Sequence, residues 1–161
     1  MKKTVFLILF SCISFCISAQ NDKLMKKWMK EHNIEYKIID IQYLSSSNLK
    51  MDIMLYDSKK SDLTQNARYA ALKTLLYDGV GKGVFSFPLL QDGEETSISK
   101  RPDYFYRLYA YRLNDFFGET SIISNYKKGD TNKGTLCEVI VKAILLRRDL
   151  ENNNIKQKMG L

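Results

Sequence analysis

The chain has 161 residues, of which 45% are hydrophobic and 27% are charged, and its formal net charge is +7. This composition excludes a disordered tail, and the length excludes two ordinary domains, so we expect one folded domain. No motif in the sequence points to a particular reaction.

Residues 1–19 have the features of a secretory signal peptide. Lys2 and Lys3 form a short basic start, residues 4–17 are almost continuously apolar, and small residues precede Gln20. The apolar run is shorter than the roughly 20 residues that a membrane-spanning helix needs. The sequence therefore predicts an exported protein of the periplasm or cell surface, with cleavage after Ala19. Loss of the two lysines would lower the net charge by two.

A lipoprotein signal is the alternative to simple cleavage. Leu9-Phe10-Ser11-Cys12 has the aliphatic-x-small-Cys order from which a lipidated cysteine would start. The bulky Phe10 and the apolar residues 13–15 after Cys12 disagree with that pattern. The two alternatives differ by a membrane anchor on Cys12.

Cleavage after Ala19 would remove Cys12 and Cys16 and leave Cys137 as the only thiol. Cys137 alternates in phase with Val139, which predicts a buried small side chain on a strand. An activated thiolate needs a neighbouring base, and the single histidine, His32, lies far away in the sequence. The sequence therefore predicts no catalytic residue, no metal site and no cofactor.

Residues 20–33 form an N-terminal amphipathic segment with helical periodicity. Its apolar side consists of Leu24, Met25, Trp28 and Met29, and its basic residues are Lys23, Lys26, Lys27 and Lys30. This helix could dock on a protein partner or touch an anionic membrane surface peripherally. The weak binding candidates are Trp28, Met29, Lys26, Lys27 and Lys30. Alternatively, the Trp28 face packs on the domain, or the segment is a loosely held tail.

The pattern changes to β from Ile34 onward. Residues 34–44 are rich in β-branched and aromatic side chains, with a phase slip at Ile38-Ile39 that predicts a bulge. In residues 49–56, Leu49, Met51, Ile53 and Leu55 alternate with Lys50, Asp52, Met54 and Tyr56. The polar residues 45–48 between the two runs predict an antiparallel hairpin.

A helix is expected from Ser61 or Asp62, with Gln65 in capping-box order, to about Asp78. The glycine-rich residues 79–83 follow this helix, whereas a phosphate-binding loop leads from a strand into a helix. We therefore interpret them as a helix stop and connector. Residues 84–87 predict a short strand or a buried extended segment.

Residues 91–100 are polar and predict a mobile surface loop in which Glu94 and Glu95 are solvated. A helix with an unusually aromatic surface is expected over residues 102–117, with Pro102 in its first turn. The least implausible catalytic candidates are Asp103, Tyr104, Arg107 and Asp115. Possible liners of an aromatic cavity are Tyr109, Tyr111 and Phe116. The charge is too modest for the interleaved arginines to indicate nucleic-acid binding.

Strands are expected over residues 120–126 and 135–146, the second near the centre of the sheet, because one of its faces is wholly apolar. One or two helical turns should follow over residues 147–151. Helices and strands mix without regular βαβ repetition, which predicts an α+β fold. We expect a single domain over residues 34–161, with a mostly antiparallel sheet and two main helices packed on one face.

Three stretches carry a resemblance: residues 75–80 (LLYDGV), residues 115–118 (DFFG) and the closing stretch from residue 146 (LRRDLENN) to Met159-Gly160-Leu161. Together they resemble a family of uncharacterised exported proteins from Bacteroides-type gut bacteria. The resemblance covers most of the chain after the signal and implies export and one α+β domain. It implies no catalytic residue, because no activity is assigned to that family.

Two classes of function remain open. The first is a non-enzymatic binding or assembly module with a protein partner in the cell envelope. The second is a small ligand- or lipid-binding protein, or a hydrolase, whose site forms only in the fold. A concave pocket with convergent polar groups would favour the second class.

Overall fold

The computed structural model describes residues 23–30, 33–81, 83–125 and 134–156. The signal peptide, the cleavage site after Ala19 and the lipoprotein alternative at Cys12 lie outside these residues, and so does His32. Export therefore stays a prediction.

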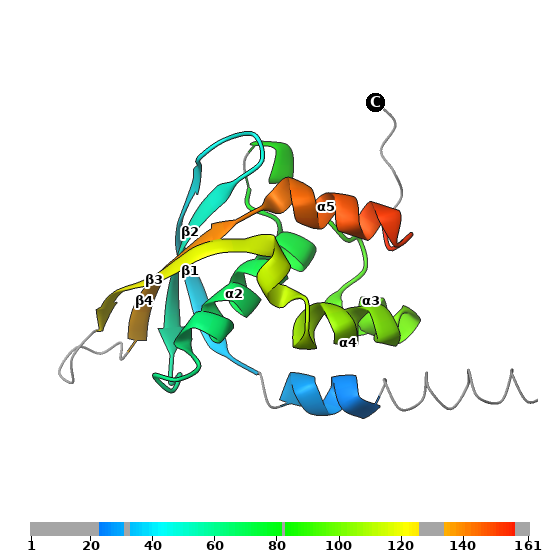
Figure 1. Cartoon of the computed structure of the whole chain (residues 1–161), viewed down its shortest axis with the longest axis horizontal. Coiled ribbons are helices and arrows are strands. Elements are labelled where there is room, and N and C mark those ends of the chain that lie inside the picture. The colour runs from blue at the N-terminus through cyan, green and yellow to red at the C-terminus, as the bar shows by residue number, and fades with distance from the viewer. Residues whose placement is uncertain (1–22, 31–32, 82, 126–133, 157–161) are drawn as a thin grey trace, which may run out of the picture.

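Within the described residues, the strands form one four-stranded antiparallel sheet in the order β1-β2-β4-β3. The strands are β1 (Glu35–Tyr43), β2 (Leu49–Tyr56), β3 (Phe117–Asn125) and β4 (Gly134–Val141). The helices lie on one side of the sheet (Figure 1). The α+β prediction is confirmed, and so is the interior position of β4, which lies between β2 and β3.

The predicted hairpin is formed by β1 and β2, including its bulge. Ile38 pairs with Ile53, and the register then shifts so that Asp40 pairs with Asp52. Two successive isoleucines cannot both face the core at a period of two, and the bulge accommodates the extra residue. Ile39 is the residue turned outward, with half of its surface exposed.

Helix α2 (Leu63–Lys73) covers the sheet and continues as a π-helical turn, η1 (Thr74–Asp78). The small side chains of Ala67, Ala70 and Ala71 are buried, which lets the helix approach the sheet closely. The predicted stop is confirmed, because Gly79 follows with φ +75°. A Cβ there would lie 2.8 Å from the backbone of Phe87.

The predicted capping box at the start of α2 is wrong. Asp62 is the N-cap residue, but its side chain makes no cap hydrogen bond. One of its carboxylate oxygens instead accepts a hydrogen bond from the Ser61 hydroxyl, at 2.7 Å. The first turn of α2 therefore starts without a side-chain cap.

The predicted mobile loop over residues 91–100 is wrong in part, because it contains helix α3 (Glu94–Lys100). Ser97 and Ile98 are buried on its inner side. Glu94 is not solvated. Its carboxylate pairs with Lys73 at 2.6 Å and accepts a hydrogen bond from the Tyr69 hydroxyl at 2.8 Å. These contacts with α2 stabilise a helix that local composition does not favour.

The expected helix over residues 102–117 is shorter than predicted. Helix α4 (Pro102–Ala110) begins with Pro102 in its first turn, as predicted. A 3-10 turn, η3 (Leu113–Phe116), follows, and β3 starts directly afterwards. The expected extended segment over residues 84–87 is also different, because residues 83–85 form a 3-10 turn, η2 (Gly83–Phe85).

Strand β4 ends at Val141, and helix α5 (Ala143–Asn152) replaces the rest of the strand predicted to residue 146. Ala143, Leu146 and Leu150 are buried at helical spacing. The Lys142 amide donates to the Phe116 carbonyl at 2.9 Å, which ties this boundary to the start of β3.

The core lies between the sheet and the helices and is rich in aromatic side chains. Its largest fully buried members include Tyr104, Tyr109, Phe85, Phe105 and Phe116. On the opposite face of the sheet, Lys50 of β2 pairs with Glu138 of β4 at 3.0 Å. In the part of the chain that the structure describes, no helix has the length and apolar character needed to span a membrane.

Candidate functional site

The structure places the binding candidates of the N-terminal segment in two different environments. In the helix over residues 23–30, Met25 is fully buried and Trp28 is half-buried. The Trp28 ring stacks on Tyr109, with 5.1 Å between centroids and 7° between planes, and meets Tyr69 edge-on at 4.8 Å. The Trp28 face therefore packs on the domain, which was one of the two alternatives. Lys26, Lys27 and Lys30 are exposed.

A hydrogen-bonded tyrosine cluster lies beneath Trp28. The hydroxyls of Tyr77 and Tyr109 are 3.0 Å apart, and Tyr69 donates to Glu94. Burial raises the pKa of Tyr69, Tyr77 and Tyr109 above the usual value for tyrosine. The three hydroxyls therefore stay protonated at neutral pH and act as hydrogen-bonding groups of the core rather than as bases.

A small pocket of about 310 Å³ opens beside this cluster. It is lined by Met29, Lys30, Asn33, Tyr69, Lys73 and Glu94. Its one carboxylate, Glu94, is already engaged by Lys73 and Tyr69. Tyr69, Lys73 and Glu94 therefore satisfy one another, which leaves Lys30 and Asn33 as the other polar side chains of this pocket.

The four catalytic candidates do not converge on a cleft. Asp103 and Arg107 form an i,i+4 ion pair at 3.5 Å on the exposed side of α4. Asp115 pairs with Arg112 at 3.3 Å. Tyr104 is buried and donates its hydroxyl hydrogen bond to Asp149 of α5, at 2.8 Å. Only the Tyr104 contact joins two separate helices, and none of the four candidates lines a described pocket.

The three suggested liners of an aromatic cavity are also separated. Tyr109 and Phe116 are fully buried within the core, whereas Tyr111 is 70% exposed. Tyr111 instead meets the neighbouring Tyr106 edge-on, at 5.7 Å between centroids. The described pockets are lined by none of these three side chains.

Cys137 is a buried side chain on the inner face of β4, as predicted. Burial raises the pKa of its thiol. We expect the folded protein to react with a thiol-specific disulfide reagent far more slowly than the protein in denaturant, because attack requires an accessible thiolate. Equal rates in the two states would contradict this placement. The described residues contain no group of three or more side chains able to hold a metal ion.

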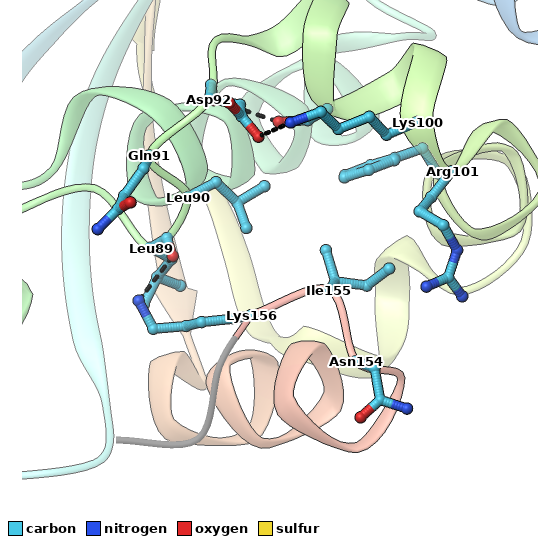
Figure 2. A pocket seen from close by; sticks show the side chains of 11 residues that line it. Leu89, Leu90, Gln91, Asp92, Lys100, Arg101, Asn154, Ile155 and Lys156 are labelled. Carbon is cyan, nitrogen blue, oxygen red and sulfur yellow. Dashed lines mark hydrogen bonds and ion pairs between the residues drawn. The ribbon is translucent and has the colours of Figure 1, made fainter. Parts of the chain in front are cut away.

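The largest described pocket, about 690 Å³, is one that the sequence did not predict. Three segments bring its lining together: residues 89–92, the junction of α3 and α4 at residues 97–105, and residues 154–156 after α5 (Figure 2). Leu90 and Ile155 point into it, and Phe105 contributes to its apolar floor. The volume is in the range of small-molecule sites.

Cationic side chains dominate the rim of this pocket. Lys100 pairs with Asp92 at 2.7 Å, and the Lys156 ammonium donates to the Leu89 carbonyl at 2.7 Å (Figure 2). The Arg101 guanidinium donates through Nη1 to the Asn153 carbonyl at 3.3 Å. Burial, followed by the nearby Arg147, lowers the pKa of Lys156. An anion bound here would offset both effects.

This arrangement can hold an anion that carries an apolar part. Three cations and one carboxylate surround the pocket, and a guanidinium has several N–H donors in a planar fork that suits carboxylate or phosphate groups. Its described lining contains neither histidine nor cysteine. Comparisons of the chain with protein-family models, with curated proteins and with solved structures find no match.

Proposed function

We propose that the chain is an exported, non-enzymatic binding protein of the cell envelope, and that the pocket between residues 89–92, 97–105 and 154–156 takes an anionic group on a short apolar body. One observation supports the ligand class: Lys100, Arg101 and Lys156 surround an apolar floor that has Asp92 as the only carboxylate in the described lining. The signal-like residues 1–19 support export.

The charge balance of the pocket favours an anion over a neutral ligand. Asp92 is paired with Lys100, so Arg101 and Lys156 contribute the net positive charge. Both donate to backbone carbonyls, which carry no formal charge that would neutralise them. Partial burial of Lys156 weakens solvent screening and strengthens its attraction to an anion.

Isothermal titration of the purified protein with octyl phosphate tests this proposal, with octyl glucoside as the uncharged comparison. We expect octyl phosphate to bind and octyl glucoside to bind much more weakly. Arg101→Gln and Lys156→Gln should each weaken octyl phosphate binding by about tenfold or more, because a hydrogen bond to a charged group contributes about 1.5–3 kcal/mol.

Arg107→Gln is the matched control, because it removes the same charge from an exposed position on α4 outside the pocket. Its affinity for octyl phosphate should stay within about twofold of the unchanged protein. Equal affinity for the two amphiphiles would overturn the anionic ligand class. Undiminished octyl phosphate binding by both Arg101→Gln and Lys156→Gln would show that the anion does not bind in this pocket.

A further inference from the structure

Three segments distant in sequence meet at one end of the sheet. They are the β1–β2 turn at residues 44–48, the η2 region at residues 83–87, and the start of α5 at residues 142–148 (Figure 1). The Phe85 amide donates to the Tyr43 hydroxyl at 3.3 Å, and the Ile144 amide donates to the Ser47 carbonyl at 3.4 Å. We refer to these three segments together as the tip.

The tip exposes several large apolar side chains. Phe87 is 81% exposed and Val84 is 63% exposed, and Leu44 and Leu145 are each about half exposed. Single exposed apolar residues are ordinary on protein surfaces, but several at one end of a domain mark an interaction site.

The backbone holds Val84 and Phe87 outward. The Val80 amide donates to the Phe85 carbonyl at 2.9 Å, and the Ser86 amide donates to the Gly83 carbonyl at 3.2 Å, so the turn is closed by its own hydrogen bonds. Phe85, between them in the sequence, is fully buried and anchors the turn in the core. Their exposure is therefore a feature of an ordered turn.

The charge of the tip has one sign. Residues 44–48, 83–87 and 142–148 contain no aspartate or glutamate, whereas they contain Lys142, Arg147 and Arg148. Arg147 is paired with Glu151 of the same helix at 3.0 Å, which leaves Lys142 and Arg148 as the cations of the tip that face solvent. Lys142 and Arg148 are exposed on either side of Leu145 in the first turns of α5. Apolar side chains flanked by the exposed cations Lys142 and Arg148 are complementary to an anionic lipid surface.

We propose that the tip docks on an anionic lipid surface, with Phe87 and Val84 entering the boundary between headgroups and acyl chains. Lys142 and Arg148 then contact anionic headgroups. The exposed apolar side chains stand on separate turns, and a fluid bilayer accepts them without the shape-complementary pocket that a protein partner would need. This surface is distinct from the ligand pocket and does not depend on the function proposed for it.

Flotation of the purified protein with vesicles tests the proposal. We expect binding to vesicles of phosphatidylglycerol and phosphatidylethanolamine, weak binding to phosphatidylcholine vesicles, and loss of binding between about 50 and 500 mM NaCl. Phe87→Ser should lower the partition coefficient about tenfold or more, because a buried phenylalanine side chain is lost. Tyr111→Ser, at an aromatic position outside the tip that is 70% exposed, should change it less than about twofold.

A second set of variants tests how much the basic side chains of the tip contribute to vesicle binding. Removing the two exposed cations of the tip with Lys142→Gln and Arg148→Gln should weaken binding about 25-fold, since each basic residue near an anionic surface contributes about fivefold. Arg107→Gln, outside the tip, should have little effect. A Phe87→Trp variant should show a blue shift of its fluorescence with anionic vesicles, and Tyr111→Trp should not.

Absence of binding to the anionic vesicles would overturn the proposal, and so would undiminished binding by Phe87→Ser. Self-association that Phe87→Ser abolishes, without vesicle binding, would assign the tip to a second copy of the chain instead. Arg101→Gln and Lys156→Gln should leave vesicle binding intact, and the tip variants should leave octyl phosphate binding intact. The two proposals can therefore fail separately.

Discussion

Replacing Asp149 with alanine is expected to lower the free energy of unfolding by about 2–4 kcal/mol. One carboxylate oxygen of Asp149 accepts a hydrogen bond from Arg112 Nη2 at 2.7 Å, and the other accepts one from the Tyr104 hydroxyl at 2.8 Å. The Asp149 side chain is 15% exposed. Its loss leaves the buried Tyr104 hydroxyl without its acceptor and frees Arg112 from α5, so the links from α5 to α4 and η3 break together.

Urea denaturation followed by circular dichroism measures this effect. Tyr104→Phe removes the hydrogen bond from the Tyr104 hydroxyl to Asp149, leaves those from Arg112, and should cost about 1 kcal/mol. Asp103→Ala is the matched control, because its ion pair with Arg107 is exposed, and it should change stability by less than about 0.5 kcal/mol. A loss below about 1 kcal/mol for Asp149→Ala would show that the cluster contributes little to the fold.

The sheet was predictable because its signals are local. Leu49, Met51 and Ile53 alternate strictly with polar residues, and a period of two specifies both a strand and its buried face. The Ile38-Ile39 slip likewise located the bulge in β1, because the shift of phase is visible in the sequence itself. The burial of Cys137 follows from the same alternation in β4.

The helical layer was less predictable because contacts distant in sequence decide it. Residues 91–100 are polar and turn-prone, yet Glu94 forms bonds with Tyr69 and Lys73, and these contacts favour a helix. The run of apolar residues after Val141 fits a strand as well as a buried helix segment. Burial of Ala143, Leu146 and Leu150 decides in favour of α5.

The pocket lined by Arg101 and Lys156 could not be predicted from the sequence, and neither could the tip. Leu90, Arg101 and Lys156 meet only through the packing of three separate segments, and no spacing connects them. The adjacent basic residues Lys100 and Arg101 were the one feature of the local sequence that could have indicated an anion-binding site. At the tip, a strand pattern would place Phe85 and Phe87 on the same face, whereas the 3-10 turn buries Phe85 and exposes Phe87.

Replacing Trp28 with alanine is expected to lower the free energy of unfolding by about 2–4 kcal/mol. The indole stacks on Tyr109 and contacts Tyr69 edge-on, so both the buried apolar area and two aromatic contacts are lost. The truncation also exposes the hydrogen-bonded hydroxyls of Tyr77 and Tyr109 to solvent. Because this is the only tryptophan, the measurement uses circular dichroism rather than tryptophan fluorescence.

Leu24→Ala is the control on the same helix, because Leu24 is partly exposed and its truncation should cost less than about 1 kcal/mol. Trp28→Phe should recover part of the loss, since phenylalanine can still stack on Tyr109. Unchanged stability in Trp28→Ala would mean that the indole does not pack on Tyr69 and Tyr109. Trp28 would then again be a candidate for contact with a partner. A large loss makes Trp28 part of the core, and a change in partner binding by that variant would then reflect a perturbed fold rather than a lost contact.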